Sequence, residues 1–398
     1  MFSKRTNWDL DENAYTRALR RHRAAGKRIF DLTASNPTTC GFQYDEEAIL
    51  NALRDPASLR YEPEPRGMLS AREAVARYYR EGGRVDVNPE HLILTTGTSE
   101  GYSFLFRLLC EPGDEALIAH PSYPLFDFLA TIQDVKLRPF QIVYDHGWQI
   151  DFHSLQKELS GRTRAIVVVH PNNPTGNFVG IREAEQLRAI CAERDLALIV
   201  DEVFLDYEWK AAPHKKRHGT FASNAAASNA AALTFVLSGL SKIAALPQMK
   251  LGWIAASGPE TAVREALARL EVIADTYLSL NAPLQCALPT LLAQRHAMQR
   301  QIAARVETNL AQLDEQLARQ KPISRLEAEG GWYAVLRVPA VQSDEELAIQ
   351  LLEERNVLVH PGHFYDFADH AYVVISLLTP TEEFKEGTNE LLACAGGS

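Results

Sequence analysis

The chain has 398 residues and a formal net charge of −10, with 46% hydrophobic and 23% charged residues. This length exceeds what a single hydrophobic core usually supports, so we expect two domains with a substrate cleft between or beside them. The acidic balance disfavours binding to nucleic acid or to an anionic membrane surface, because both partners are negatively charged.

The cysteines and the N-terminus indicate a cytoplasmic protein. The five cysteines form neither a CxxC pair nor a zinc-ligand spacing, and their odd number indicates reduced thiols. The N-terminal residues are charged and lack the apolar core of a signal peptide. No stretch approaches the roughly 20 apolar residues of a membrane span. We therefore expect a soluble, intracellular protein without disulfide bonds.

The N-terminal part of the chain predicts an arm rather than a domain. Residues 11–25 have a polar helical pattern, residues 28–32 a short strand pattern, and residues 35–39 form an irregular polar segment. We expect residues 1–45 to form an arm that contributes to the smaller of the two domains.

From about residue 70, helical stretches alternate with short runs of branched apolar residues. The helical stretches include residues 71–81 and 182–193. This alternation predicts an α/β domain over residues 46–280, with a mainly parallel sheet covered on both faces. The expected strands are residues 91–94, 115–119, 165–170, 196–200, 233–237 and 251–256.

The pattern changes after about residue 258 to long helical runs. Residues 260–276 and about 297–320 are helical in pattern, and two short strands are expected near residues 331–338 and 372–376. These elements predict a smaller α+β domain, which we place at residues 281–398.

Polar residues recur directly after the expected strands, where open α/β sheets place their ligand sites. Gly97, Thr98 and Ser99 follow the strand at residues 91–94. They could form a plain helix cap, or they could bind an anion at the helix N-terminus. Asn173 lies in a Pro/Asn/Gly segment that could be only a tight turn, or could point its amide into the same crevice.

Asp201 and Lys242 follow the next two strands along the chain. A carboxylate at the end of a buried strand must be paired or solvated, and a cationic ring nitrogen would suit Asp201. The amine of Lys242 becomes a useful nucleophile when desolvation or nearby positive charge lowers its pKa. An anion cradle, an amide, a carboxylate and a lysine in this order match what a phosphorylated pyridine aldehyde requires.

Other segments add to this pattern along the chain. They are Ser35-Asn36-Pro37, Tyr61, Pro65-Arg66-Gly67, Pro121-Ser122-Tyr123, Asn172-Asn173-Pro174-Thr175-Gly176, Asp201-Glu202-Val203-Phe204, Ser241-Lys242 and Pro361-Gly362. With them the chain resembles, over nearly its whole length, the class I/II aminotransferases, which are pyridoxal-phosphate (PLP) dependent enzymes of fold type I. The resemblance implies a mainly parallel seven-stranded sheet and a smaller α+β domain.

The resemblance implies three catalytic residues. Lys242 would hold PLP as a Schiff base and shuttle a proton, Asp201 would pair with the pyridine nitrogen, and Tyr123 would stack on the ring. Asn173 would donate its amide to ring oxygen O3′. Tyr61 would reach the partner's phosphate across a dimer interface, which implies a homodimer with shared active sites. The residues implied around the phosphate are Gly97, Thr98, Ser99, Ser238, Ser241 and Lys250.

Three cofactor positions depart from the pattern of the family. Phe204 stands where many relatives carry a tyrosine that bonds O3′, so we expect a raised pKa for the link between Lys242 and PLP. Lys250 replaces an arginine and supplies charge without a bidentate fork, which predicts a lower affinity for PLP. Gly239 takes the place of a common phosphate-binding hydroxyl, with Ser238 beside it as a substitute.

The departure with the largest consequence is Val374, which stands where relatives carry the arginine that binds the substrate α-carboxylate. Either the amine of the substrate is not on an ordinary α-amino acid, or other residues anchor the carboxylate. The candidate substrate-binding residues are Ser35, Asn36, Asn173, Trp332, His363 and Tyr365. We expect no metal site, because no acidic or thiol ligand spacing accompanies His360, His363 and His370.

The resemblance implies an aminotransferase that moves an amino group between an amine or amino acid and a 2-oxo acid. The missing arginine leaves open a PLP-dependent lyase, decarboxylase or cyclising synthase, which would use the same lysine. A PLP-sensing regulatory domain is disfavoured, because the charge is acidic and no DNA-binding helical module precedes the fold.

Overall fold

The computed structural model describes the chain except for residues 82–84, 211–216, 223–231, 321, 370 and 396–398. Its largest element is a sheet with the strand order β2-β9-β8-β7-β6-β3-β4-β5. Strands β8, β7, β6, β3 and β4 are parallel, whereas β9 is antiparallel to both of its neighbours. The strands are β2 (Leu92–Thr95), β3 (Glu115–His120), β4 (Lys136–Tyr144), β5 (Trp148–Ile150), β6 (Thr163–Val169), β7 (Ala197–Asp201), β8 (Thr234–Gly239) and β9 (Gly252–Ser257).

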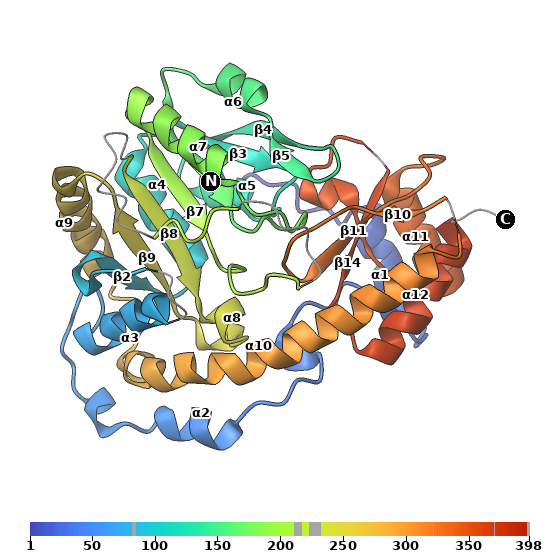
Figure 1. Ribbon diagram of the computed structural model, residues 1–398, viewed down its shortest axis with the longest axis horizontal. Helices are drawn as coiled ribbons and strands as arrows, with labels where there is room; N and C mark the ends of the chain where they lie inside the picture. The colour runs from blue at the N-terminus through green and yellow to red at the C-terminus, as the bar shows by residue number, and fades with distance from the viewer. Residues whose placement is uncertain (82–84, 211–216, 223–231, 321, 370, 396–398) are drawn as a thin grey trace.

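Helices cover both faces of this sheet (Figure 1). Alternate side chains of the buried strands enter two separate cores, as a strand with two covered faces requires. In β7, Leu198 and Val200 pack in the first core, whereas Ala197 and Ile199 pack in the second. The first core includes α3 (Leu69–Arg80), α7 (Ile181–Arg194) and α10 (Ala282–Leu317), and the second includes α4 (Thr98–Leu109), α5 (Phe126–Ile132) and α9 (Glu260–Tyr277).

The predicted fold class is confirmed, and the sheet has one strand more than the seven expected. Neither β4 nor β5 is among the six strands that the apolar runs predict. Strand β5 has three residues and pairs antiparallel with β4 at the edge of the sheet. The strands β2, β3, β6, β7 and β8 all run in one direction, since β2 and β8 are both antiparallel to β9. Their carboxyl ends therefore meet at one edge, where the sequence places the polar residues.

A second, smaller sheet lies at the other end of the molecule (Figure 1). It is antiparallel, with the order β10-β11-β14-β13. Its strands are β10 (Ser324–Arg325), β11 (Tyr333–Arg337), β13 (His360–Pro361) and β14 (Tyr372–Ser376), and its helices are α1 (Ala14–Ala24), α11 (Asp344–Arg355) and α12 (Thr381–Ala395). The N-terminal arm joins this region, because β1 (Phe30–Asp31) pairs in parallel with β12 (Val357–Leu358).

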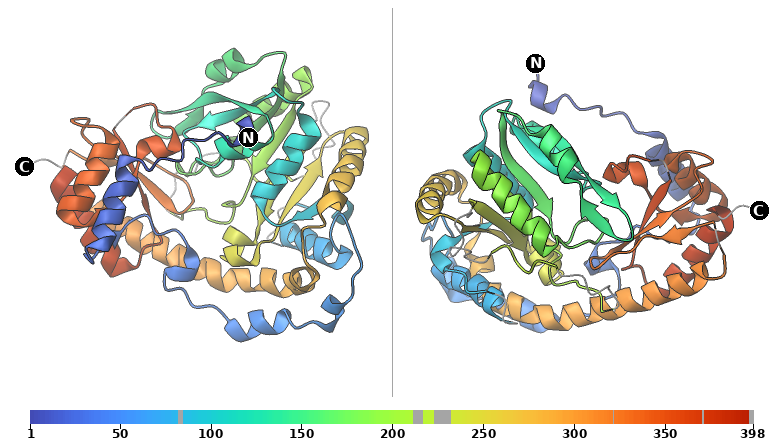
Figure 2. Two further views of the ribbon diagram at one scale, coloured as in Figure 1. Left: turned by 180° about the vertical axis from the view of Figure 1, so that it is seen from behind. Right: turned by 45° about the horizontal axis from the view of Figure 1, so that its top comes forward.

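Helix α10 runs from the large sheet to the small one and packs against both α3 and α12 (Figure 2). It is 36 residues long and begins well before the residue 297 that the hydrophobic pattern predicts. Asn281 caps its N-terminus by accepting a hydrogen bond from the amide of Leu284 at 3.0 Å. Proline is favourable in the first turn, where no intrahelical N–H bond is needed, so Pro283 starts the helix.

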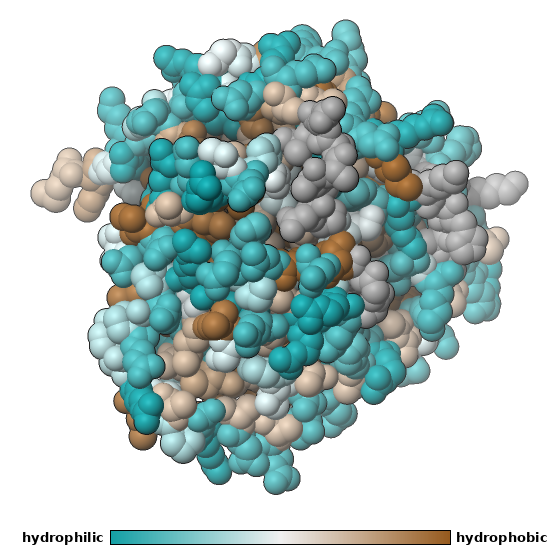
Figure 3. Space-filling model, turned by 60° about the vertical axis from the view of Figure 1, so that its left-hand side comes forward, coloured by the Kyte–Doolittle hydropathy of each residue, from teal (hydrophilic) through white to brown (hydrophobic). Residues whose placement is uncertain are grey.

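Shorter helices complete the chain. They are α2 (Glu46–Ala52), α6 (Phe152–Glu158) and α8 (Leu240–Ile243). The face of the molecule that Figure 3 brings forward is mainly hydrophilic, with hydrophobic side chains between the polar ones. Among the described residues, no helix combines the length and the apolar character that crossing a membrane requires.

Candidate active site

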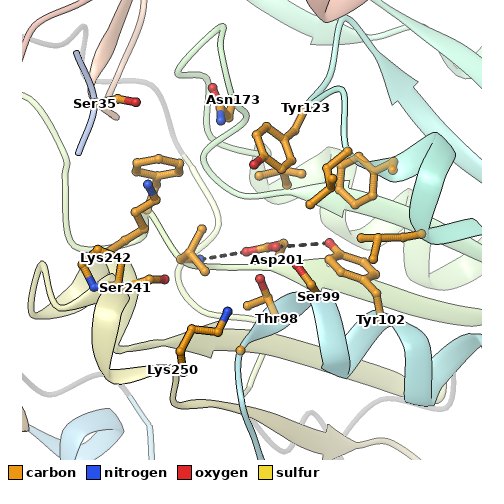
Figure 4. A pocket seen from close by; sticks show the side chains of 18 of the residues that line it. Ser35, Thr98, Ser99, Tyr102, Tyr123, Asn173, Asp201, Ser241, Lys242 and Lys250 are labelled. Carbon is orange, nitrogen blue, oxygen red and sulfur yellow. Dashed lines mark hydrogen bonds between the residues drawn. The ribbon is translucent and has the colours of Figure 1, made fainter. Parts of the chain in front are cut away.

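A cavity of about 300 Å³ lies at the carboxyl ends of the parallel strands and is also lined by Ser35 of the N-terminal arm and Tyr333 of β11. It brings together side chains that are far apart in the sequence (Figure 4). Of the site residues that the sequence predicts, those lining it are Ser35, Gly97, Thr98, Ser99, Tyr123, Asn173, Asp201, Phe204, Ser241, Lys242 and Lys250.

Lys242 lies on the short helix α8, which follows β8 directly. Its Nζ is 4.6 Å from the centre of the Trp332 ring and 5.4 Å from that of the Phe204 ring. Enclosure by these groups lowers the pKa of the Lys242 amine to about 8, against the opposing influence of the Asp201 charge. Close to neutral pH a useful fraction of this amine is therefore unprotonated and can act as a nucleophile.

Asp201 is the last residue of β7, and its carboxylate is buried. One oxygen accepts the amide of Val203 at 3.0 Å, and the other accepts the hydroxyl of Tyr102 at 3.2 Å. Burial raises the pKa of Asp201 to about 6, although both hydrogen bonds and the charge of Lys242 lower it. Two neutral donors do not offset a buried negative charge, so this carboxylate is suited to a cationic partner.

Sequence reasoning missed Tyr102, which lies one helical turn after Thr98 on α4. Burial, followed by the Asp201 charge, raises the pKa of its phenol well above 10, so the hydroxyl stays protonated and donates to Asp201. In the sequence it resembles an ordinary aromatic residue on the buried face of a helix. Its position one turn after the polar loop was the available signal.

One end of the cavity is arranged for an anion. Gly97 precedes α4 with φ 149°, a conformation that favours glycine, and no side chain caps the helix. A Cβ built on Gly97 would lie 3.8 Å from the Nζ of Lys250, so this cation stands directly over the loop. Thr98 and Ser99 line the same end (Figure 4). The positive end of the helix dipole, a cation and hydroxyls together suit a phosphate.

A close approach of two backbone segments shapes this anion-binding end. A Cβ on Gly252 would lie 2.9 Å from the carbonyl oxygen of Ser238 and 3.0 Å from the Cα of Gly97. Only glycine permits this contact, which presses the start of β9 against the loop before α4. Ser238 itself is buried outside the cavity lining, with its Oγ 3.5 Å from the carbonyl oxygen of Glu202.

The opposite end of the cavity carries neutral polar groups. Asn173 is buried, and its Oδ1 has no hydrogen-bond partner among the described atoms. Ser35 lines this end together with Tyr333, another residue that sequence reasoning missed. Burial raises the pKa of Tyr333 to about 12. Tyr123 points its hydroxyl into the interior of the cavity (Figure 4).

The remaining predicted site residues lie outside the cavity lining. Asn36 is exposed and caps the turn Pro37–Thr39 by accepting the amide of Thr38 at 3.2 Å. The ring Nδ1 of His363 is 3.0 Å from a carboxylate oxygen of Asp344, so its local role is structural. Trp332 is fully buried beneath Lys242, with an indole N–H that has no partner among the described atoms.

Tyr61 and the candidate metal ligands also lie away from this cavity. Tyr61 is 83% exposed, beside a separate groove that Leu278 and Gln285 help to form. Within the described part of the chain, no group of three His, Cys, Asp or Glu side chains is placed to hold a metal ion. His370 lies outside the described residues.

Val374 is fully buried in β14, where it pairs directly with Val335 of β11 and His360 of β13. The next pair on the same face joins Ser376 to Tyr333, which lines the cavity. Directly paired residues share one face of an antiparallel sheet, so Val374 belongs to the face that carries Tyr333. The wall behind Tyr333 therefore has the apolar side chain of Val374 at the position where the resemblance to the family implies a carboxylate-binding arginine.

The residues of the cavity fit PLP. The carboxylate of Asp201 needs a cation, and the loop around Gly97 leaves a helix end open beneath Lys250. A protonated pyridine nitrogen and a phosphate meet these two requirements. Lys242 supplies the amine for the aldehyde.

Comparisons with known proteins agree with this fit. The family described as aminotransferase class I and II matches residues 27–387. A glutamate-pyruvate aminotransferase of Haemophilus influenzae is 24% identical over 372 residues, covering 92% of this chain and 90% of that protein. An alanine aminotransferase of Mycobacterium tuberculosis is 27% identical over 361 residues, covering 88% and 82%.

Solved structures show the same fold. An aminotransferase from Escherichia coli superposes with a TM-score of 0.86 at 21% identity, covering 100% of this chain and 98% of that one. An alanine aminotransferase from Pyrococcus furiosus also gives 0.86, at 23% identity and 98% coverage of both chains. With the family match over most of its length, the chain belongs to the class I and II aminotransferases, which are PLP-dependent enzymes of fold type I.

Proposed function

We propose that Lys242 binds PLP covalently and that the protein transfers an amino group from an amine or amino acid to a 2-oxo acid. One observation carries this assignment. The amine of Lys242, with its pKa lowered to about 8 by burial, shares a cavity with the buried carboxylate of Asp201 and the anion-binding start of α4. Those are the groups that an aldehyde, a ring nitrogen and a phosphate need.

Four residues of the cavity have separate roles in binding the cofactor and in proton transfer. When bound, PLP supplies an electron sink for negative charge on the carbon that carries the amino group. The carboxylate of Asp201 would hold the ring nitrogen protonated, because that pairing would remove the cost of its own burial. Lys242 Nζ takes the proton from the amine-bearing carbon of the substrate and returns it. Tyr123 would stack on the ring, and Asn173 would donate its side-chain amide to the ring oxygen.

The phosphate group would bind at the end of the cavity that lies next to the start of α4. Thr98, Ser99 and Ser241 offer hydroxyl groups, and Lys250 offers a charge. The N-terminus of α4 adds backbone N–H groups and the positive end of the helix dipole. Gly97 leaves the backbone N–H groups accessible for this contact. A residue with a side chain would adopt its φ of 149° only with strain.

Amino-group transfer is favoured over elimination, decarboxylation or cyclising replacement. All of these reactions would use Lys242 and Asp201 in similar ways, so the two residues do not separate them. The family match over residues 27–387 favours transfer. The relatives named for alanine, glutamate and pyruvate make these three compounds the first substrates to test.

The experiment that tests the reaction type uses the PLP-loaded protein without turnover. L-Alanine or L-glutamate is added, and the absorption spectrum of the bound cofactor is recorded. Transfer predicts conversion to the pyridoxamine form, followed by return to the starting spectrum when pyruvate is added. Release of ammonia or carbon dioxide with an unconverted cofactor would contradict the proposal.

We also propose a homodimer in which Tyr61 completes the phosphate site of the partner subunit. Leu59 and Tyr61 are 88% and 83% exposed, and Val272 and Tyr277 on α9 are also exposed. Exposed apolar side chains of this size are typical of an interface between subunits. Tyr61 lies outside the cavity of its own chain, as a residue that serves a partner must.

Subunit complementation tests the shared site. Lys242→Ala and Tyr61→Ala are each inactive or weakened alone, but a mixed dimer contains one site with both native residues. After exchange of equal amounts, about one quarter of the sites should be intact. Activity of the mixture that equals the mean of the two separate variants would rule out sharing.

Two further features of organisation are proposed. We place the domain boundary near the start of α10, with residues 46–280 as the large domain and residues 1–45 and 281–398 as the small one. The pairing of β1 with β12 supports the union of the arm with the C-terminal part. The described cysteines are all free, which supports a reducing, cytoplasmic location.

A further inference from the structure

The two ends of the cavity differ in charge. Among the lining residues that the structure describes, the charged side chains are Asp201, Lys242 and Lys250. Lys250 stands over Gly97 at the phosphate end, and Lys242 is occupied by the cofactor in the proposed function. Ser35 and Asn173 lie at the opposite end (Figure 4). The substrate end therefore has polar groups and no cation of its own.

The groups around the substrate end are uncharged at neutral pH. Burial raises the pKa of Tyr333 to about 12, and burial also raises the pKa of Tyr123. Burial lowers the pKa of His360 to about 4, so this ring next to Val374 is neutral. These side chains can donate and accept hydrogen bonds, but they do not attract an anion as a cation would.

Two arginines of the small-sheet region contact other groups and do not lie at the substrate end of the cavity. Arg337 lies on β11 beyond Tyr333, and its guanidinium is 5.8 Å from the ring centres of both Tyr144 and Tyr372. Arg305 donates to the carbonyl oxygens of Cys40 and Leu378 at 3.2 and 2.9 Å. Neither lines the cavity.

A carboxylate is poorly matched to this end of the cavity. Taking a carboxylate out of water is costly unless a cation pairs with it, and neutral hydrogen bonds are about half as strong as charge-assisted ones. The phosphate of the cofactor and Asp201 also add negative charge to the same site. A hydroxyl group carries no such cost, and it can both donate to and accept from the hydroxyls of Ser35 and Tyr333.

We propose that the preferred amino-group donor carries an uncharged hydroxyl-bearing substituent on its amine-bearing carbon, as in an amino alcohol, and no α-carboxylate. This inference rests on the proposed aminotransferase function. The hydroxyls of Ser35 and Tyr333, together with the Oδ1 of Asn173 that has no partner among the described atoms, form the subsite for that substituent. The acceptor 2-oxo acid enters the same cavity, so weak binding of the acceptor also follows.

The overall reaction balances without any further reagent. The donor exchanges its C–N bond for a C=O bond and becomes a hydroxy ketone, which is an oxidation by two electrons. The 2-oxo acid exchanges its C=O bond for a C–N bond, takes up those two electrons and becomes an amino acid. The proton lost from the donor carbon is replaced by one gained at the acceptor carbon.

Three matched amines test the proposal. L-Alaninol, L-alanine and isopropylamine share one frame and differ only in a hydroxymethyl, carboxylate or methyl group at the position concerned. Each is titrated into the PLP-loaded protein, and the visible absorbance of the cofactor reports amine binding before any turnover. L-Leucinol and L-leucine repeat the comparison with a larger side chain. We expect each amino alcohol to bind about 10-fold more tightly than its amino acid.

The outcomes separate this inference from the proposed function. Equal or tighter binding of L-alanine and L-leucine overturns the inference and leaves the aminotransferase assignment in place. A cofactor spectrum that responds to none of these amines overturns the assignment, and the inference with it.

Two variants test the subsite itself. Tyr333→Phe and Ser35→Ala each remove one hydroxyl with little change in shape. Each should weaken the binding of L-alaninol by about 3- to 10-fold and leave that of isopropylamine unchanged. An equal loss for both amines would show a structural effect and would overturn the role of these hydroxyls.

Discussion

Replacing Asp201 by asparagine should stabilise the cofactor-free protein and at the same time weaken its hold on PLP. Burial raises the pKa of Asp201 from 3.8 to about 6. The folded chain therefore holds this proton more tightly than the unfolded chain does. Stability is lost as the pH rises from about 4 to about 6, and the full cost is present above that window.

The size of the effect follows from the pKa difference. A difference of roughly two pH units corresponds to about 3 kcal/mol at neutral pH. Asparagine keeps the acceptor for the amide of Val203, and Tyr102 can rotate its hydroxyl to accept from the new amide. The substitution also removes the negative charge that favours the protonated amine of Lys242, which reduces the gain in stability. We expect Asp201→Asn to gain about 1 to 2 kcal/mol at pH 7.5.

Thermal unfolding of cofactor-free protein measures this gain. The unfolding temperature of Asp201→Asn should exceed that of the wild type at pH 7.5, and the advantage should shrink as the pH falls toward 4. PLP affinity should fall about 10- to 100-fold, because a charge-assisted bond to the ring nitrogen is lost. Tyr102→Phe is the matched control, since it keeps the carboxylate, removes a donor and should lower the unfolding temperature.

The reasoning would be refuted by either of two results. A lower unfolding temperature of Asp201→Asn at pH 7.5 would show that the buried carboxylate does not destabilise the folded protein. Unchanged PLP affinity would show that Asp201 does not contact the cofactor.

Two other substitutions test the cofactor site. Lys250→Arg should slow the loss of PLP on dialysis, because the guanidinium can bind phosphate through two hydrogen bonds, whereas Lys250→Ala should speed it; equal rates for both would exclude contact with the phosphate. Phe204→Tyr should lower, by about one pH unit, the pH at which the visible absorbance of the bound cofactor titrates, because a hydroxyl near the ring oxygen stabilises its negative charge. An unchanged or higher midpoint would place residue 204 away from that oxygen.

The strand-end residues of the site could be predicted from local patterns alone. Asp201 and Lys242 each follow a buried apolar run, and parallel strands bring their carboxyl ends to one edge. Knowing the strands was therefore enough to expect these side chains near one another. Asn173 follows β6 in the same way, whereas Tyr123, which follows β3, was expected only from the resemblance to the family.

The residues that were missed depend on contacts between distant parts of the chain. Tyr102 looks like any aromatic residue on a buried helix face, and its bond to Asp201 joins positions 99 apart. Tyr333 acquires its role by meeting Ser35, which comes from the N-terminal arm. Neither meeting leaves a local pattern in the sequence.

The fold shows a similar division. The parallel sheet was predicted from the alternation of apolar runs with helices, but β4 and β5 were not. Strand β4 has few buried side chains and contains a proline, and β5 has three residues and is too short for a periodic signal. The start of α10 was missed because Pro283 and Pro289 suggest a break. Proline in the first turn is compatible with a helix, and packing against α3 and α12 supports the rest.

The attachment of PLP to Lys242 is tested most directly by borohydride reduction followed by mass spectrometry of the digested protein. Reduction should fix the cofactor on the peptide that contains Lys242, and Lys242→Ala should retain none, while Lys250→Ala keeps the label. Covalent cofactor on any other residue of the wild type, or its retention by Lys242→Ala, would contradict the central claim.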